Sequence, residues 1–202
     1  MDKIMVGIAE GKIARKTQVL ASYALGSCVA ICLYDPKNKI AGMAHAILPR
    51  KEDAVDQGNP YKFAREGASE LIRAMVNSGA EKKQITAKLV GGARMFKTRE
   101  RDMEIGARNV MAAKEALHKE GVSILAEDTG KNYGRTVFFH AEDGRIQVST
   151  IKKDNHCNMS NYGGAIMSTK NKQVVMVIDD SLLICKEIKK SAWGRSIHLR
   201  ST

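Results

Sequence analysis

The chain has 202 residues, with 33 Lys and Arg against 22 Asp and Glu, and a formal net charge of +11. It contains no uncharged apolar run long enough to span a membrane, and its N-terminal stretch MDKIMVGIAEGKIARK lacks the apolar centre of a secretory signal. The four cysteines show no disulfide-scaffold spacing. These features predict a cytoplasmic protein without membrane insertion, and a length sufficient for one domain with a largely aliphatic core.

The positive charge predicts an acidic partner. Nucleic acid is the first candidate, but the basic residues are spread along the chain and mixed with acidic ones, and the sequence has no nucleic-acid-binding motif or row of stacking aromatics. The charge is therefore explained either by a solvated surface or by electrostatic attraction towards an acidic protein surface, and no nucleic-acid partner is expected.

The first half of the chain predicts strands and one helix. A short apolar run at residues 5–9 starts a sheet, residues 17–20 lead into a hairpin, and the hairpin strands are residues 28–34 and 39–48, joined by the turn sequence DPKN. A packing helix follows, because Asn59-Pro60 is typical of a helix start, apolar residues then recur at helical spacing, and Ser78-Gly79 is typical of a helix end.

The second half predicts a strand at residues 85–90, ended by Gly91-Gly92, and a second amphipathic helix from Ile105 that ends at Gly121. A strand at residues 122–127, a turn in which Asp128 is a turn former or a substrate contact, and a hairpin of residues 135–140 and 145–151 complete the pattern. Mostly hairpin-linked strands with two covering helices predict an α+β layered sandwich with mixed, largely antiparallel sheets.

The hairpin places a thiol near an imidazole. If residue 34 faces residue 39, Cys28 lies directly opposite His45, and facing residues project from the same side of the sheet. A histidine within reach can deprotonate the thiol, and Gly26-Ser27 offers backbone N–H groups that could hold an oxyanion. The alternative is simple packing, since free cysteine is among the most buried residue types.

Several motifs in order resemble one family. These are LGSCVAI, GMAHAILP, AKLVGGARMF, IGARNV and AEDTG…GR, and the chain resembles the chemoreceptor glutamine deamidase CheD family over roughly residues 3–151. The resemblance implies an α/β/β sandwich and a cysteine amidohydrolase that needs no cofactor. It also implies that the partners are methyl-accepting chemotaxis receptors as protein substrate and a CheC-like phosphatase.

The resemblance also implies roles for individual residues. Cys28 is the nucleophile, His45 is the base, and Ser22 stands where the family commonly has a threonine that orients the histidine. The family usually has a second glycine where Lys131 stands. Gly26 and Ser27, which precede the cysteine, are the predicted oxyanion or pocket residues, and the resemblance places Gly91 and Gly92 of the AKLVGGARMF motif at the border of the same pocket.

Other functions stay open from the residues alone. A non-catalytic adaptor on receptors or on a CheC-like phosphatase would use the same surfaces with an inert cysteine, and a cysteine peptidase is a weaker possibility. His156-Cys157 could join Cys28 or Cys32 around a metal ion, but the spacing is not that of a zinc site, so we expect no metal.

Composition predicts a division of the chain into residues 1–151, a CheD-like domain, residues 152–172, a linker, and residues 173–202, an appendage. Residues 174–190 resemble the first strand and helix of a response-regulator receiver domain, with Asp179 and Asp180 matching its Mg²⁺-binding acids. The rest of a receiver does not fit in the remaining residues. The alternative is a C-terminal strand and helix that are specific to this chain, unrelated to a receiver domain, and dock on the main domain.

Overall fold

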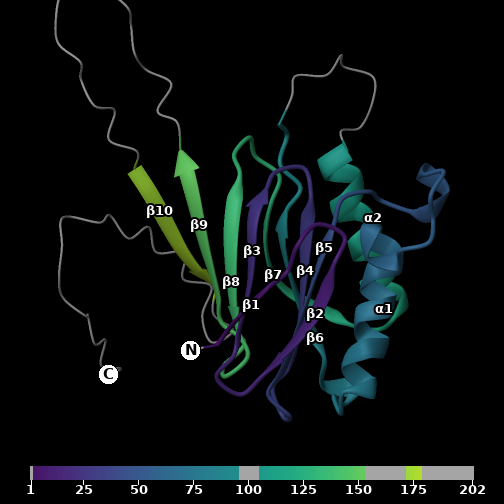
Figure 1. Cartoon of the computed structure of the whole chain (residues 1–202), viewed down its shortest axis with the longest axis vertical. Helices are drawn as coiled ribbons and strands as arrows, with labels where there is room; N and C mark the ends of the chain where they lie inside the picture. The colour runs from purple at the N-terminus through teal and green to yellow at the C-terminus, as the bar shows by residue number, and fades with distance from the viewer. Residues whose placement is uncertain (1, 96–104, 153–171, 179–202) are drawn as a thin grey trace, which may run out of the picture.

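The protein is a three-layered sandwich of helices, a central sheet and an outer sheet (Figure 1). A computed structural model describes residues 2–95, 105–152 and 172–178. The central sheet has the strand order β2-β5-β4-β6-β7, and the outer sheet has the order β1-β3-β8-β9-β10. Both sheets are mixed, because β1 pairs with β3 in parallel and β6 pairs with β7 in parallel, whereas the other pairs are antiparallel. The α+β sandwich predicted from the sequence is confirmed.

The elements have the following bounds. The central sheet consists of β2 (Gly11–Arg15), β4 (Val29–Asp35), β5 (Ile40–Ala46), β6 (Thr86–Gly91) and β7 (Ser123–Thr129). The outer sheet consists of β1 (Lys3–Met5), β3 (Val19–Leu25), β8 (Arg135–His140), β9 (Ile146–Lys152) and β10 (Lys172–Ile178). The helices are α1 (Ala64–Asn77) and α2 (Ile105–Lys119), with short 3-10 turns at Lys51–Asp53, Pro60–Lys62 and Lys82–Gln84.

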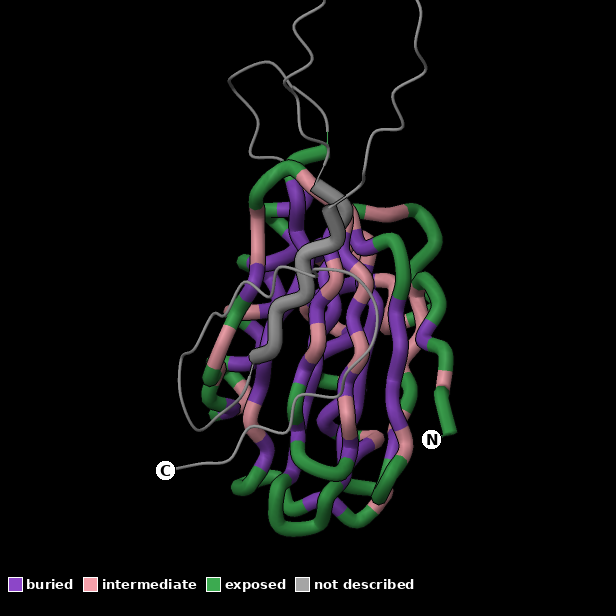
Figure 2. The backbone as a smooth tube through the Cα atoms, turned by 90° about the vertical axis from the view of Figure 1, so that its left-hand side faces the viewer, coloured by how far each residue is buried: buried purple, intermediate pink, exposed green. Residues whose placement is uncertain are grey.

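Two hydrophobic cores separate the three layers. One lies between the helices and the central sheet and contains Leu71 of α1, Leu117 of α2 and Ile31 of β4. The other lies between the two sheets and contains Cys32 of β4 and Phe139 of β8. Strand β4 is therefore buried on both faces, which explains why its sequence is apolar from Val29 to Leu33 instead of alternating. The outer sheet alternates buried and half-buried residues along β8, as Figure 2 shows from its side.

The helix ends agree with their sequence signals, but α1 begins at Ala64 and not at the predicted start, Asn59-Pro60. The Asn59 side chain accepts a hydrogen bond from the Tyr61 N–H, and this cap closes a 3-10 turn just before α1. Helix α1 ends at Ser78 and Gly79, as predicted, and α2 is followed by Gly121 with a φ of 73°. The N-terminal region differs from the prediction. Its first strand is Lys3–Met5, and residues 11–15 add β2, which the apolar pattern does not reveal.

The β4–β5 hairpin pairs two residues away from the predicted register. Ala30 lies opposite His45, and Asp35 lies opposite Ile40, so Cys28 is not the direct partner of the histidine. Cys28 precedes Ala30 by two residues. Because side chains alternate along a strand, a shift of two residues keeps Cys28 and His45 on the same face of the sheet.

The turn chemistry explains the shifted register. The Asp35 carboxylate accepts hydrogen bonds from the backbone N–H groups of Lys37 and Asn38, at 2.9 and 3.1 Å. Lys39 has a φ of 51° and therefore belongs to the loop and not to the strand. The loop spans four residues, and β5 begins one residue later than predicted.

The last described segment is an edge strand. β10 pairs antiparallel with β9 over seven residue pairs, from Lys172 with Lys152 to Ile178 with Ile146. It therefore extends the outer sheet of the main fold. The division into domain, linker and appendage stays a prediction, and Asp179, Asp180 and the His156-Cys157 pair lie outside the described residues.

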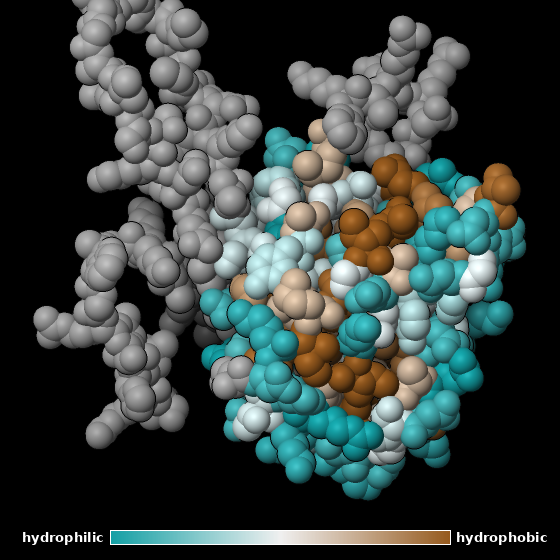
Figure 3. All heavy atoms as spheres, in the orientation of Figure 1, coloured by the Kyte–Doolittle hydropathy of each residue, from teal (hydrophilic) through white to brown (hydrophobic). Residues whose placement is uncertain are grey.

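Within the described ranges, neither helix has the length and the apolar content needed to cross a membrane. Figure 3 shows one face of the molecule, on which hydrophobic residues form several separate groups among hydrophilic ones. The large apolar side chains that are exposed come from different elements and include Ile8, Val55, Met95 and Met111.

Candidate active site

Cys28 and His45 both face the space between the two sheets. Cys28 lies immediately before β4, is partly buried, and packs against the core between the sheets. His45 lies near the end of β5, is 2% exposed, and reaches towards the outer sheet. In antiparallel pairs, residues displaced by two positions have Cβ atoms about 7–8 Å apart. The thiol and the imidazole are therefore diagonal neighbours. No hydrogen bond joins them in the described structure.

Ser22 fixes the orientation of the histidine from the opposite sheet. Its hydroxyl lies on β3, is fully buried, and donates to the Val6 carbonyl at 3.0 Å. The same Oγ lies 2.9 Å from His45 Nδ1. Because the single hydroxyl hydrogen is given to Val6, Nδ1 must be the donor to Oγ. The neutral imidazole then carries its lone pair on Nε2, which has no partner within the described residues. The His45 ring is thus in a tautomer whose Nε2 can accept a proton.

Burial sets the protonation states of both groups. It raises the pKa of the Cys28 thiol above its ordinary value, and the backbone N–H of the same residue opposes this shift. Burial also lowers the pKa of His45 below its ordinary value, with the Val6 carbonyl acting in the opposite direction. At neutral pH the pair therefore rests as a thiol and a neutral imidazole, which is the starting state for general-base activation.

The backbone around the thiol is held by three hydrogen bonds. The carbonyl of Gly26 accepts from the Ala93 N–H at 2.8 Å, and the carbonyl of Cys28 accepts from the Gly92 N–H at 2.7 Å. The carbonyl of Ser27 accepts from the Asn109 side chain at 2.9 Å. Every carbonyl of this short segment is therefore bonded to a neighbouring element. The N–H groups of Ser27 and Cys28 donate to no other residue in the described part of the chain.

Gly91 and Gly92 permit this close approach. A Cβ atom on Gly91 would lie 2.3 Å from the Cys28 carbonyl oxygen, and the residue has a φ of 118°. A Cβ atom on Gly92 would meet Val110 of α2 at 2.4 Å. The predicted pocket glycines are thus brought together with Cys28. Because the Gly92 N–H is already bonded to the Cys28 carbonyl, its contribution is backbone packing, and it is not available to an oxyanion.

Asp128 is an ion-pair partner, contrary to the prediction of a turn former or a substrate contact. It lies within β7 and accepts two hydrogen bonds from Arg135 of β8, from Nε at 2.8 Å and from Nη2 at 3.0 Å. Both side chains are almost fully buried. Arg135 also donates to the Gly130 carbonyl, and the Gly130 N–H donates to the Gly91 carbonyl. The pair thus joins the two sheets beside the glycine loop, which is formed by Gly91 and Gly92.

Asn109 is a residue to which the sequence analysis assigned no role. It is fully buried on α2, where the surrounding buried positions are small or apolar. A usable signal was present in the sequence. An asparagine on the apolar face of a predicted helix is a poor helix former and a buried amide, so it requires hydrogen-bond partners.

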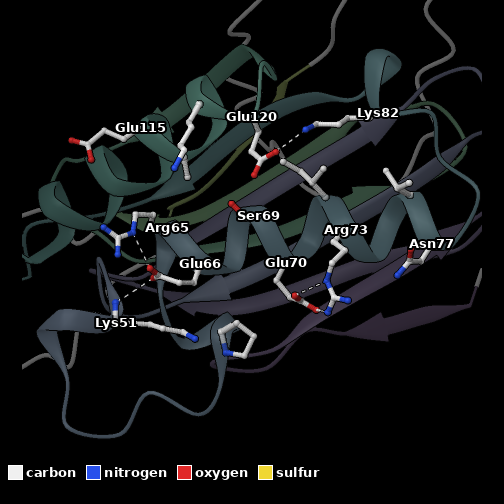
Figure 4. A pocket seen from close by; sticks show the side chains of 15 residues that line it. Lys51, Arg65, Glu66, Ser69, Glu70, Arg73, Asn77, Lys82, Glu115 and Glu120 are labelled. Atoms are coloured by element: carbon white, nitrogen blue, oxygen red, sulfur yellow. Dashed lines mark hydrogen bonds and ion pairs between the residues drawn. The ribbon is translucent and has the colours of Figure 1, made fainter.

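A large groove of the described structure lies away from these residues. It has a volume of about 810 Å³, runs between α1 and α2, and contains none of the predicted site residues. Figure 4 shows that its charged side chains pair with each other, as Glu70 does with Arg73 and Glu120 with Lys82. No cluster of three His, Cys, Asp or Glu side chains that could hold a metal ion occurs among the described residues.

A buried imidazole oriented by a hydroxyl, with a thiol on the same face of the sheet, provides the groups that cysteine-dependent acyl-transfer enzymes use. Comparison with known proteins gives the family. A family profile described as CheD chemotactic sensory transduction matches residues 47–150. The chain belongs to the CheD family.

Curated relatives are similar to the chain over about 150 residues, more than the family profile matches. "Probable chemoreceptor glutamine deamidase CheD" of Caldanaerobacter subterraneus subsp. tengcongensis is 47% identical over 150 residues, covering 73% of this chain and 93% of the relative. "Probable chemoreceptor glutamine deamidase CheD 1" of Methanosarcina acetivorans is 42% identical over 73% of this chain and 92% of the relative. "Probable chemoreceptor glutamine deamidase CheD" of Thermococcus kodakarensis is 38% identical over 74% of this chain and 93% of the relative.

Proposed function

We propose that the protein is a cysteine-dependent protein-glutamine deamidase that converts glutamine side chains of chemoreceptors to glutamate. The observation that carries the proposal is the oriented histidine. Ser22 holds Nδ1 as a donor, Nε2 keeps its lone pair, and Cys28 lies on the same face of the sheet. The names of the relatives supply the substrate class, since each is called a chemoreceptor glutamine deamidase.

The proposed reaction has two halves. In the first half, Cys28 Sγ attacks the carbon of the substrate carboxamide while His45 Nε2 takes the thiol proton. The C–N bond then breaks, His45 returns the proton to the departing nitrogen, and ammonia leaves behind a thioester. In the second half, His45 deprotonates a water molecule that attacks the thioester, and the thiolate leaves and is reprotonated. The sum is glutamine and water converted to glutamate and ammonia.

We assign oxyanion stabilisation to the N–H groups of Ser27 and Cys28. Both are next to the sulfur, and neither donates to another described residue. Their carbonyls are bonded to neighbouring elements, so the segment is held before substrate arrives. Donors that are already aligned strengthen the interaction with a developing negative charge, because little reorganisation is needed during the reaction.

The charge of the chain and the names of the relatives support a chemoreceptor as the partner. A net charge of +11 favours attraction to an acidic protein surface, and a chemoreceptor is the substrate that the names of the relatives give. Binding of a CheC-like phosphatase, which the family resemblance implies, stays a prediction from the sequence.

The test uses two cysteines of the same region. Wild-type protein should release ammonia from a purified chemoreceptor signalling fragment, and Cys28→Ala should release none. Cys32→Ala is the matched control, because Cys32 is buried in β4 and burial raises the pKa of its thiol to about 12. It should retain wild-type activity. Equal ammonia release by wild type and Cys28→Ala would refute the assignment of the nucleophile.

A non-catalytic adaptor is the second candidate, and one observation favours it. Burial keeps the Cys28 thiol protonated, and no hydrogen bond joins it to His45. An adaptor would bind the receptor fragment equally well as wild type and as the Cys28→Ala variant, and would release no ammonia in either form. Binding without ammonia release by the wild type would therefore select the adaptor.

A further inference from the structure

We propose that Asn109 is a positioning residue that sets the separation of Cys28 and His45 by bridging two backbone segments beyond the end of the β4–β5 ladder. This inference deepens the proposed function and rests on it. It starts from the register, in which Val29 and Ala46 are the last paired residues of the two strands. Cys28 stands just outside this last pair, so the sheet hydrogen bonds alone do not hold its segment against β5.

Asn109 spans this gap from the helix layer. Its Nδ2 atom donates to the Ser27 carbonyl at 2.9 Å and to the Ile47 carbonyl at 3.1 Å. One acceptor immediately precedes Cys28, and the other lies two residues after His45. Both hydrogens of a single amide nitrogen are thus used to tie the two strand extensions together.

The orientation of the amide follows from its partners. Turning it over would place Oδ1 against two carbonyl oxygens, and acceptors do not bond to one another. Asn109 is fully buried, and its Oδ1 has no partner within the described residues. The side chain therefore holds the two segments while its own Oδ1 stays buried without a partner among the described residues. A buried acceptor without a partner costs free energy, so this arrangement is unfavourable for a residue that serves only packing.

Helix α2 is itself fixed against the site. A Cβ atom on Gly106 would lie 2.6 Å from the Gly92 carbonyl oxygen, so the first turn of the helix is packed directly on the glycine loop. Gly92 in turn donates to the Cys28 carbonyl. The amide of Asn109 is thus carried by a rigid element that already contacts the neighbourhood of the nucleophile, and this supports a preorganised geometry.

The test separates positioning from general stability. Asn109→Ala removes both donors and keeps a strong helix former, and Asn109→Asp keeps the size but puts oxygen in place of nitrogen. Leu117→Ala is the matched control, because it destabilises the same helix from its buried face without touching either segment. With a receptor fragment, both Asn109 variants should lower kcat about 10- to 100-fold at unchanged KM. Leu117→Ala should leave both constants unchanged below its melting temperature.

A second readout does not depend on the deamidase reaction. Iodoacetamide alkylation of Cys28 at pH 7.5, followed by peptide mass spectrometry, should be slower in Asn109→Ala and in His45→Ala. The double variant should be no slower than His45→Ala alone, because Asn109 acts on Cys28 only through its separation from His45 and has no further effect once the imidazole is removed. If the wild type released no ammonia, the proposed function would fail. The alkylation rates would still show whether Asn109 positions Cys28 relative to His45. The inference would be overturned if the Asn109 variants had the kcat and the alkylation rate of the wild type. It would also be overturned if the two substitutions slowed alkylation independently, so that the double variant reacted more slowly than His45→Ala alone.

Discussion

Ser22 of the outer sheet and His45 of the central sheet meet inside the sandwich, with Oγ and Nδ1 2.9 Å apart. The contact joins β3 to β5, and its geometry assigns the proton of the imidazole to Nδ1. The hydroxyl thus connects the architecture to the chemistry. The two sheets must stack correctly before His45 acquires the tautomer that the proposed mechanism needs.

Removing this hydroxyl should impair the reaction without abolishing it. Ser22→Ala leaves the His45 Nδ1–H buried without its acceptor, at a cost of about 1–3 kcal/mol, which corresponds to a fall in kcat of about 5- to 150-fold. Thr150→Val is the control, because Thr150 carries a buried hydroxyl in the same sheet with no partner in the described residues. Thr150→Val should release ammonia at the wild-type rate. Unchanged kcat in Ser22→Ala would show that the contact does not orient the base.

The pH profile should be flat around neutrality. His45 must be neutral to accept a proton, and burial lowers its pKa, so the acid limb of kcat/KM should lie below the ordinary histidine value of about 6.5. Burial raises the pKa of Cys28, so the thiol should stay protonated beyond the ordinary value of about 8.5. The same His45 shift should reduce the free energy of unfolding as the pH falls below about 6.5, because the unfolded chain then binds the proton first. An NMR titration of the His45 ring with a pKa above 6.5 would contradict this prediction.

The buried ion pair should contribute strongly to stability. Asp128→Asn leaves the Arg135 guanidinium buried without a counter-charge, and breaking such a pair costs about 3–5 kcal/mol. Asp143→Asn breaks an exposed pair with Arg145 and should cost less than about 1 kcal/mol. Urea unfolding measures both. Similar losses in the two variants would show that the buried pair is no more important than the surface one.

Two glycines allow steric contact to be separated from backbone strain. Gly91 and Gly121 both have positive φ, at 118° and 73°, but only at Gly91 would a Cβ atom strike the Cys28 carbonyl oxygen. Gly121→Ala should cost about 1–3 kcal/mol from backbone conformation alone. Gly91→Ala should cost more and should also reduce ammonia release. Equal stability losses with full activity in Gly91→Ala would contradict the close approach of the glycine loop to the nucleophile.

Sequence patterns predicted the elements that local chemistry determines. The two helices, their ends at Gly79 and Gly121, and the β8–β9 hairpin follow from apolar periodicity and turn residues, and the structure confirms them. Lys131 has a φ of 61°, in the region that favours glycine, and this backbone conformation is consistent with the glycine that the family resemblance implies at this position.

The remaining features depend on contacts between distant segments. The hairpin register depended on the Asp35 side chain binding the turn backbone, which residue spacing does not reveal. Asn109 and the Asp128–Arg135 pair act only after a helix or a second sheet has packed in place. The contact between Ser22 and His45 was implied by family resemblance, since hydroxyls that precede a cysteine do not by themselves indicate which one meets the histidine.

The most direct test is mass spectrometry of a chemoreceptor fragment co-expressed with each variant. Conversion of a glutamine carboxamide to a carboxylate adds about one mass unit per site, and in the proposed mechanism this conversion begins with attack of the Cys28 thiol on the carboxamide carbon. We predict this increase with wild-type protein and with Cys32→Ala, and an unmodified fragment with Cys28→Ala and His45→Ala. The same increase with Cys28→Ala, or none with wild-type protein bound to the fragment, would contradict the proposed chemistry.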